Sequence, residues 1–387
     1  MPVLQPGSAT LGVLGGGQLG RMFVHAAQTL GFRTVVLDPD AESPAGLVAH
    51  EHLKADYLDA QALDALSERC DAITTEFENV PAQALNALAR RRVVAPSGAA
   101  VAVCQDRADE KAHFRASGVE CAPHALIRGA ADLAAVDEAL LPGILKTARM
   151  GYDGKGQVRV RSRVELDAAW QALKNVPCVL EQMLPLALEL SVIVARGADG
   201  QIVQFPVQQN LHRDGILAVT QVPAPAVSDA LRAQAAESAA RIAASLAYVG
   251  VLCVEFFVLQ DGRLVVNEMA PRPHNSGHYT LDACDLSQFD LQVRAMAGLP
   301  LVAPRLHSPT LMLNLLGDLW FDAQGRERTP LWDQVLALPG THLHLYGKTN
   351  PRAGRKMGHL NITAADAQQA DQVARQAASL LGLPRDW

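Results

Sequence analysis

Apolar and polar positions alternate in blocks along the first hundred residues. Short apolar runs of strand length are separated by longer segments with helical periodicity. The expected strands are 10–14, 34–37, 72–75 and 93–94, and the expected helices are 18–30, 58–70 and 81–91. Strands separated by helices pair in parallel through right-handed crossovers, so we predict an α/β domain with a parallel sheet.

The pattern changes after residue 100. A helix at 106–117 and strands at 143–147, 157–161 and 178–182 predict a small α+β lobe with an antiparallel sheet. A larger lobe and a short β-rich piece follow. Their expected strands are 188–196, 202–208, 251–259 and 263–269, and their expected helices are 228–246, 287–297 and 364–381. Pro300 and Pro304 mark a boundary between the two.

Composition and charge exclude several functional classes. Of the 387 residues, 49% are hydrophobic and 19% are charged, which is a globular balance with room for two or three domains. The net charge of -6 gives no indication of a nucleic-acid partner. No apolar run reaches the roughly 18 residues that a membrane span needs. The six cysteines form no Cys-x-x-Cys pair, so we expect free thiols in a cytoplasmic protein.

A glycine loop follows the first strand. Gly15-Gly-Gly-Gln-Leu-Gly20 satisfies the G-x-G-x-x-G pattern, and Asp38 ends the next strand, where a dinucleotide site would place a ribose-binding carboxylate. Glycines let the backbone approach an anion, and the helix N-terminus supplies N–H donors. The pattern therefore leaves three interpretations open: a nicotinamide dinucleotide, another phosphorylated ligand, or a structural turn. The later motifs favour the second.

Two glutamates face each other across a predicted hairpin. Asp261-Gly262 is a strong signal for a two-residue turn, and with these residues as the loop Glu255 lies directly opposite Glu268. Opposed carboxylates about 4.5–5.5 Å apart repel each other, and Mg²⁺ between them would relieve the repulsion. Alternatively, both acids are solvated or paired with arginines such as Arg272. The same face is expected to carry Cys253, Phe257 and Val266.

A second glycine-rich segment joins two expected strands of the small lobe. Gly151-Tyr-Asp-Gly-Lys-Gly-Gln157 can close over phosphates, and Lys155 can neutralise their charge. Lys146, on the preceding strand, reaches the same space. Lysines and backbone amides are the usual groups that stabilise a transferring phosphoryl group. The alternative is a mobile, exposed hairpin.

These motifs resemble those of the ATP-grasp enzymes. The similarity covers Lys146, the loop 151–157, Glu181-Gln182 and the Glu255/Glu268 pair. It becomes closer with Gly15-Gly-Gly-Gln-Leu-Gly-Arg21, Thr75-Glu-Phe-Glu-Asn-Val-Pro81, Asn267-Glu-Met-Ala-Pro-Arg272, His274-Asn-Ser-Gly-His278 and Gly354-Arg-Lys-Met-Gly-His-Leu-Asn361. Together, from about residue 10 to the C-terminus, they resemble the N5-carboxyaminoimidazole ribonucleotide synthetase family.

The resemblance implies a three-domain architecture of α/β and α+β parts. A Rossmann-like domain would occupy 1–103 and a two-lobed ATP-grasp domain 104–303, with lobes at about 120–184 and 185–303. A small β-rich C-terminal domain would occupy 304–387. The family also implies a homodimer.

The resemblance further implies a set of nucleotide contacts and one or two Mg²⁺ ions. The metal would be held by Glu255 and Glu268. Ala270 stands where many ATP-grasp enzymes carry an Asn ligand, which leaves open how a second ion would be held. The residues implied to contact ATP are Arg107, Lys146, Gly151, Tyr152, Asp153, Gly154, Lys155, Gly156, Gln157, Glu181, Gln182, Met183, Leu184, Glu189, His212, Asn267 and Glu268.

The implied acceptor is aminoimidazole ribonucleotide, bound between the N-terminal and ATP-grasp domains. Its 5′-phosphate is expected at the helix that begins near Gln18. Arg272 and His274 are expected to hold bicarbonate, and Asp153 to orient or deprotonate the amine. The implied substrate contacts are Gln18, Leu19, Glu76, Asn275, Ser276, Lys348, Arg355 and Lys356. The implied catalytic residues are Tyr152, Asp153, Arg272, His274, Lys348 and Arg355.

The implied reaction is an ATP- and bicarbonate-dependent carboxylation of this amine through carboxyphosphate, with release of ADP and phosphate. Three alternatives stand beside it. They are a formate-using glycinamide ribonucleotide transformylase or another carboxylate–amine ligase of the same fold, a dehydrogenase built on the Gly15 loop, and a binding protein without activity. The dehydrogenase would leave the segment 146–157 and the glutamate pair unexplained.

Overall fold

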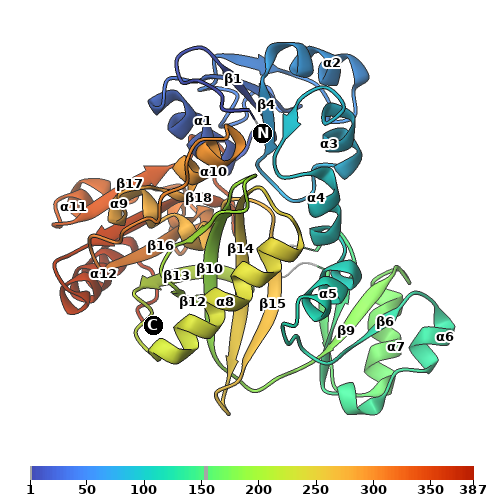
Figure 1. Cartoon of the computed structure of the whole chain (residues 1–387). Helices are drawn as coiled ribbons and strands as arrows, with labels where there is room; N and C mark the ends of the chain where they lie inside the picture. Colours follow the sequence, from blue (N-terminus) through green and yellow to red (C-terminus); the bar gives the residue numbers. More distant parts are fainter. Residues whose placement is uncertain (1, 152–155) are drawn as a thin grey trace.

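The computed structural model describes residues 2–151 and 156–387 and divides into a body and a projecting lobe (Figure 1). The first part is a five-stranded parallel sheet in the order β3-β2-β1-β4-β5. Helices α1 (Gln18–Thr29), α2 (Ala60–Arg69) and α3 (Ala82–Leu88) connect its strands. Its strands are β1 (Thr10–Leu14), β2 (Arg33–Leu37), β3 (Glu51–Leu53), β4 (Ala72–Thr75) and β5 (Val93–Val94). The predicted parallel α/β domain is confirmed.

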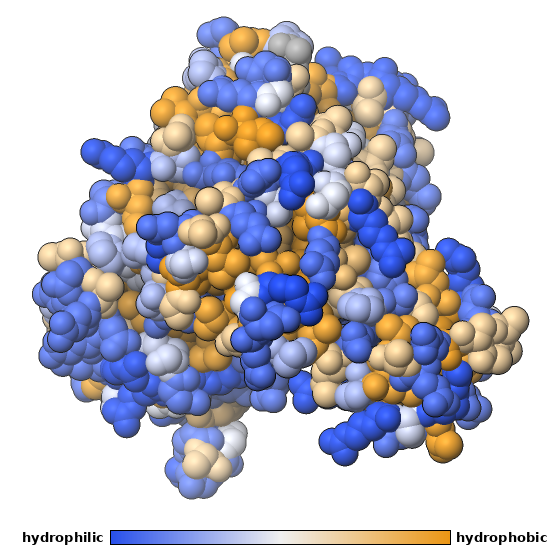
Figure 2. Space-filling view, turned by 60° about the horizontal axis from the view of Figure 1, so that its bottom comes forward, coloured by the Kyte–Doolittle hydropathy of each residue, from blue (hydrophilic) through white to orange (hydrophobic). Residues whose placement is uncertain are grey.

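The small lobe is a four-stranded antiparallel sheet in the order β6-β9-β7-β8. Helices α4 (Gly98–Cys104) and α5 (Arg107–Ala116) lead into it, and α6 (Ala130–Ala134) and α7 (Arg163–Ala172) cover it. The strands are β6 (His124–Ile127), β7 (Gly143–Thr147), β8 (Gln157–Val160) and β9 (Cys178–Gln182). An indentation separates this lobe from the body (Figure 2), whose visible surface mixes hydrophilic areas with smaller hydrophobic ones.

The large lobe and the C-terminal segment share one nine-stranded sheet. Its order is β15-β14-β10-β12-β13-β16-β18-β17, with β11 paired to β10. The large-lobe strands are β10 (Leu186–Arg196), β11 (Ile202–Gln204), β12 (Gln208–Arg213), β13 (Ile216–Val222), β14 (Gly250–Leu259) and β15 (Leu264–Ala270). The C-terminal strands are β16 (Thr310–Leu316), β17 (Thr341–Leu345) and β18 (Lys356–Thr363). The domain boundaries expected at 103/104 and 303/304 stay predictions.

Strand β12 was not predicted, because its residues, Gln208 to Arg213, lack an apolar alternation. It is nevertheless an interior strand. Its inward polar groups find partners there, since Asn210 Nδ2 donates to Ser191 Oγ at 2.8 Å and Thr220 Oγ1 donates to Asn210 Oδ1 at 3.0 Å. Hydrogen bonding thus replaces hydrophobic burial at these positions.

The hairpin between β14 and β15 differs from the prediction in two ways that offset each other. Leu259 N donates to Arg263 O at 2.9 Å, so the turn contains three residues, with Gly262 at φ +87°, rather than two. A β-bulge at Asn267 then adds one residue to β15. The two changes cancel, and Glu255 does lie opposite Glu268 as predicted.

The bulge also reverses one predicted side-chain direction. Phe257 lines the same cavity as Glu255, as expected. Val266 does not share that face, because the register below the bulge differs by one residue. It packs instead with Val254 and Phe256 in the core beneath α8 (Asp229–Ser245).

Helix α10 (Gln288–Met296) joins two hydrophobic cores. Phe289, Val293 and Met296 pack with α1 and the parallel sheet. Leu291 and Ala295 pack with the large sheet, on the face opposite α8. The remaining helices are short α9 (Thr280–Ala283) and α11 (Trp332–Leu336), together with α12 (Ala367–Leu381), which packs on the C-terminal strands.

All six cysteines are free thiols, as predicted. The described helices include none with the length and apolar character needed to cross a membrane.

Phe289→Ala should lower the free energy of unfolding by about 3–5 kcal/mol, because Phe289 is fully buried where α10 meets the N-terminal domain. Urea unfolding followed by circular dichroism measures the loss. Leu336→Ala is the matched control, since Leu336 is 52% exposed and its truncation should change little. Equal effects of the two substitutions would contradict the role given to α10.

Candidate active site

A cavity of about 670 Å³ lies where the three sheets meet. It is the place to which most of the predicted site residues converge. Those lining it are Gln18, Leu19, Glu76, Arg107, Lys146, Gly151, Gln157, Glu181, Gln182, Met183, Leu184, Glu189, His212, Glu255, Asn267, Glu268, Arg272, His274, Asn275 and Lys356. Four predicted residues, Tyr152, Asp153, Gly154 and Lys155, lie outside the described residues.

Four other predicted residues do not line this cavity. Ser276 is fully buried behind it and contacts His274 Nδ1 through its Oγ at 2.9 Å. Lys348 donates to Gln18 Oε1 at 2.8 Å, so it touches a lining residue. Arg355 donates to Asn350 O at 2.7 Å, and Gly156 precedes β8, where its carbonyl accepts from Thr147 N at 2.8 Å.

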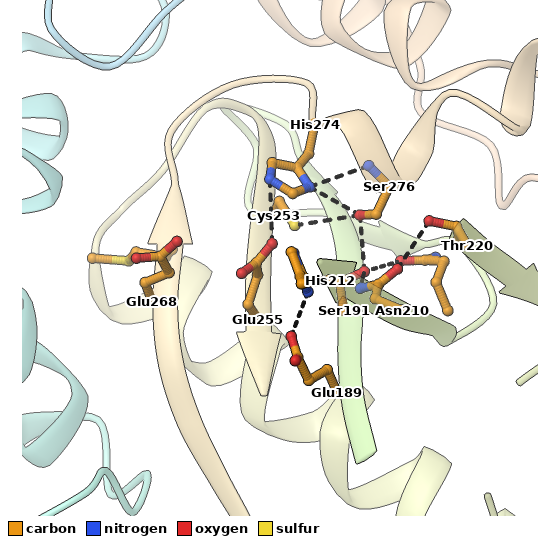
Figure 3. Close-up of polar contacts among 12 residues, drawn as sticks. Glu189, Ser191, Asn210, His212, Thr220, Cys253, Glu255, Glu268, His274 and Ser276 are labelled. Atoms are coloured by element: carbon orange, nitrogen blue, oxygen red, sulfur yellow. Dashed lines mark hydrogen bonds and ion pairs between the residues drawn. The ribbon is translucent and has the colours of Figure 1, made fainter. Parts of the chain in front are cut away.

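The opposed glutamates project from adjacent strands (Figure 3), and both line the cavity. Burial and the charge of Glu268 raise the pKa of Glu255 to about 7. Burial acts in the same direction on Glu268, but Arg107, whose Nη1 lies 3.1 Å from Glu268 Oε2, lowers the pKa of that carboxyl. His274 Nε2 lies 3.3 Å from Glu255 Oε1. The pair is therefore only partly compensated by protein groups.

The donor set at the glutamates suits a hard divalent cation. Besides the two carboxylates, the bulged residue Asn267 has a buried Oδ1 that bonds to no described residue. Carboxylate and amide oxygens are ligands that Mg²⁺ accepts. These three residues fit such an ion, and the orphaned amide oxygen is the observation that supports the fit.

A buried charge network connects the lobes beside the glutamates. Lys146 Nζ donates to Glu181 Oε2 at 3.0 Å, and Lys111 Nζ lies 3.2 Å from Glu181 Oε1. Burial would raise the pKa of Glu181, but Lys146 and Lys111 lower it to about 2. Lys111 also donates to Asn267 O at 3.3 Å, so one cation on α5 contacts both lobes.

His212 forms an ion pair with Glu189 on the neighbouring strand of the large sheet (Figure 3). Burial acts to lower the pKa of His212, but Glu189 and Glu255 raise it to about 8. The imidazole is therefore largely protonated at neutral pH and places a positive charge near the glutamates.

The glycine loop of the N-terminal domain is filled by the protein's own carboxylates. Glu76 accepts from the N–H groups of Gly17 and Gly20, both at 3.0 Å, and Asp38 accepts from Gly16 at 2.7 Å. A Cβ at Gly15 would lie 2.4 Å from the Glu76 side chain. These glycines thus make room for Glu76, which occupies the position that a dinucleotide pyrophosphate would need.

Charged residues of the C-terminal segment lie beside the cavity, where Lys356 lines it and Lys348 contacts Gln18. Lys348 also donates to Lys356 O at 2.8 Å, and burial together with Arg355 lowers the pKa of Lys348 to about 8. Arg272 forms an ion pair with Glu78. Since that guanidinium already has a carboxylate partner, an anion at Arg272 would share it with Glu78.

Comparisons with known proteins match this arrangement along almost the whole chain. A synthase from Brucella melitensis, named N5-carboxyaminoimidazole ribonucleotide synthase, is 46% identical over 92% of this chain and 96% of its own. The enzyme of the same name from Bacillus subtilis is 41% identical over 93% and 92%. The chain belongs to the N5-carboxyaminoimidazole ribonucleotide synthase family.

Family domains and solved structures agree. The ribonucleotide synthetase preATP-grasp domain matches residues 8–105, the ATP-grasp domain 112–289, and the phosphoribosylaminoimidazole carboxylase C-terminal domain 310–373. The Staphylococcus aureus N5-carboxyaminoimidazole synthetase complexed with ADP has a TM-score of 0.89 and 38% identity, covering 97% of this chain and 98% of its own.

The Aspergillus clavatus synthase in complex with ADP and 5-aminoimidazole ribonucleotide has a TM-score of 0.88 and 34% identity, covering 97% and 99%. The predicted fold class and family are confirmed. As a member of this N5-carboxyaminoimidazole ribonucleotide synthase family, the chain is an ATP-grasp ligase.

Several charged residues at the cavity were not predicted from the sequence. Glu78 and Glu110 line it, and Lys111 lies behind it. Glu110 accepts from Met269 N at 2.7 Å, and burial raises the pKa of its carboxyl to about 7. The helical spacing of Arg107, Glu110 and Lys111 put them on one face of α5, which was the available signal.

Glu255→Gln should stabilise the metal-free protein at pH 8 and change its stability little at pH 5. The folded-state pKa of Glu255 lies above its usual value, so the folded protein holds a proton that the unfolded chain releases between about pH 4.5 and 7. Wild-type stability therefore falls as pH rises through this window, by up to about 3 kcal/mol, and Gln removes the loss.

Urea unfolding in EDTA at both pH values measures this difference. Glu237→Gln, at an exposed position on α8, is the matched control and should show no pH-dependent gain. A Glu255→Gln protein that gains nothing at pH 8 would show that the opposed pair is not destabilising.

Proposed function

We propose that this protein carboxylates the amine of 5-aminoimidazole ribonucleotide at the expense of ATP and bicarbonate, giving N5-carboxyaminoimidazole ribonucleotide. One observation carries the proposal. A single cavity is lined by Lys146, Glu255 and Glu268 from the two lobes and by Gln18 and Glu76 from the N-terminal sheet domain. A nucleotide and a second ligand can therefore meet inside it.

The nucleotide would lie between the lobes. Its phosphates would meet Lys146, Arg107 and protonated His212, and the strand from Glu181 to Leu184 would line the adenine pocket. In the structure Lys146 is paired with Glu181, which Lys111 also neutralises. Because Lys111 remains with Glu181, Lys146 can turn toward a phosphate without leaving a buried carboxylate unpaired.

Magnesium would be held by Glu255, Glu268 and the amide oxygen of Asn267. When bound, it neutralises the negative charge of the nucleotide phosphates. The number of ions stays a prediction, and so do the contacts of Tyr152, Asp153 and the rest of the loop.

The acceptor would lie against the N-terminal domain. Glu76 holds Gly17 and Gly20, so at the start of α1 the amides of Gln18 and Leu19 remain for the ligand. The 5′-phosphate would reach these amides together with Lys348, Arg355 and Lys356. The predicted phosphate site at the start of α1 would therefore use two backbone donors, the amides of Gln18 and Leu19.

Bicarbonate would bind beside Arg272 and His274, close to the glutamates. Its oxygen attacks the γ-phosphorus of ATP, and the bond to ADP breaks, giving carboxyphosphate. The acceptor amine then attacks the carboxyl carbon, phosphate leaves, and the amine loses a proton, for which Asp153 is the proposed acceptor. The protein positions the reactants and excludes water from the short-lived intermediate. A homodimer and a cytoplasmic location also stay proposals.

Purified protein should release ADP only when bicarbonate is present, and 5-aminoimidazole ribonucleotide should stimulate the release strongly. The motivation is the single cavity and the family relationship. A coupled ADP assay with and without each compound measures this. Formate with glycinamide ribonucleotide serves as the rival substrate pair. Equal or faster turnover with that pair would overturn the proposal.

Glu268→Gln should lower kcat by about 10²–10³-fold, because one of the preorganised carboxylates at the phosphate site loses its charge. Steady-state rates at several magnesium concentrations test this, with Glu237→Gln as the matched control. Wild-type turnover with an unchanged magnesium dependence would refute the metal-binding assignment.

A further inference from the structure

A second set of metal-ligand atoms lies beside the opposed glutamates. Cys253, Glu255 and His274 offer a sulfur, an oxygen and a nitrogen that all lie within 4.8 Å of one another. Cys253 and Glu255 are two residues apart on β14 and so share a face, while His274 follows β15 (Figure 3). A thiol, a carboxylate and an imidazole differ from the oxygen ligands that suit magnesium.

The separations fit a tetrahedral zinc ion. Zinc bonds to histidine nitrogen and carboxylate oxygen are about 2.0–2.2 Å long, which puts two such ligands about 3.4 Å apart. His274 Nε2 and Glu255 Oε1 are 3.3 Å apart. A sulfur ligand at about 2.3 Å from zinc would have to approach these atoms by at most about 1.2 Å, which a change in the Cys253 side chain can supply.

The surroundings orient the ligands. His274 Nδ1 contacts Ser276 Oγ at 2.9 Å, so Nε2 is the nitrogen directed at Glu255. Nδ1 also accepts from Ser276 N at 3.3 Å, so zinc at Nε2 requires the ring proton to move to Nδ1, where Ser276 Oγ can accept it. Cys253 lies directly opposite Ala270, whose small side chain lines the cavity. Glu255 and His274 line it too, so an ion can enter from there.

We propose that Cys253, Glu255 and His274 form a binding site for zinc, with the fourth position open to the cavity. Thiol and imidazole ligands select zinc over magnesium. On binding, the Cys253 thiol loses its proton to solvent and bonds to the metal as a thiolate. The site takes Glu255 from the magnesium set and His274 from the bicarbonate set, so zinc should inhibit the enzyme. The inhibition rests on the proposed function, whereas the binding site does not.

Binding is tested on the whole protein without substrates, by calorimetric titration with zinc chloride and by absorption after titration with cobalt chloride. Cobalt bound to a thiolate gives a charge-transfer band in the near ultraviolet, which histidine and carboxylate ligands alone do not give. Wild type should show this band and bind one zinc ion. Cys253→Ser should abolish the band and weaken zinc binding by more than about 100-fold, and Ser276→Ala should weaken it by about 10–100-fold.

Cys178→Ser is the matched control, because Cys178 is a buried thiol in the core of the small lobe and should not affect zinc binding. Cys253→Ala serves as a second variant, and circular dichroism checks that both Cys253 variants fold. A cobalt band that survives in both folded variants, or zinc affinity equal to that of wild type, would overturn the site.

Activity separates this inference from the proposed function. Zinc should inhibit ADP release by wild type and the Cys178→Ser protein, while Cys253→Ser should keep its magnesium-dependent turnover and resist zinc. Zinc binding that depends on Cys253 in a protein without carboxylase activity would keep the site and overturn the proposed function. Inhibition that is equal in wild type and Cys253→Ser would overturn the inhibitory role of the site.

Discussion

The repulsion between Glu255 and Glu268 organises the site. Two carboxylates on adjacent strands are held opposite each other, and the protein compensates their charge only in part, through Arg107 beside Glu268 and through His212 and Arg272 near Glu255. The fold tolerates the destabilisation caused by this repulsion, because the hydrophobic cores beneath α8 and around α10 stabilise it. Such a pair favours a cation, and the proposed magnesium ion would bring the nucleotide phosphates to the same place.

The glycine loop of the N-terminal domain shows the reverse arrangement, in which groups that attract an anion face a carboxylate of the chain. Backbone amides at the glycine loop would attract an anion, and Glu76 supplies one from within the chain. Lys348 then comes from a segment more than 300 residues later and donates both to Gln18 at the start of α1 and to Lys356 O. The acceptor site that we propose would thereby be assembled from both ends of the chain, and the proposed nucleotide site from its middle.

Periodicity and motifs predicted the alternating parallel domain, the antiparallel small lobe and the family, because these depend on local pattern. The position of Glu255 opposite Glu268 was also predicted. That prediction contained two errors that cancel, because it assumed a two-residue turn and did not include the β-bulge. The polar strand β12 and the ion pairs of Lys111 and Glu78 were missed. These depend on partners distant in sequence, which a pattern along one chain does not reveal.

The continuous sheet has a consequence for how the chain can be divided. Strand β13 pairs with β16 along Val219–Val222, so the C-terminal segment covers a row of backbone donors and acceptors that belong to the large lobe. Cutting the chain before β16 would turn β13 into an exposed edge, and such edges recruit strands from other molecules. The last segment therefore protects the enzyme against aggregation as well as contributing lysines, and a shortened form would need a new cap along β13 to remain monodisperse.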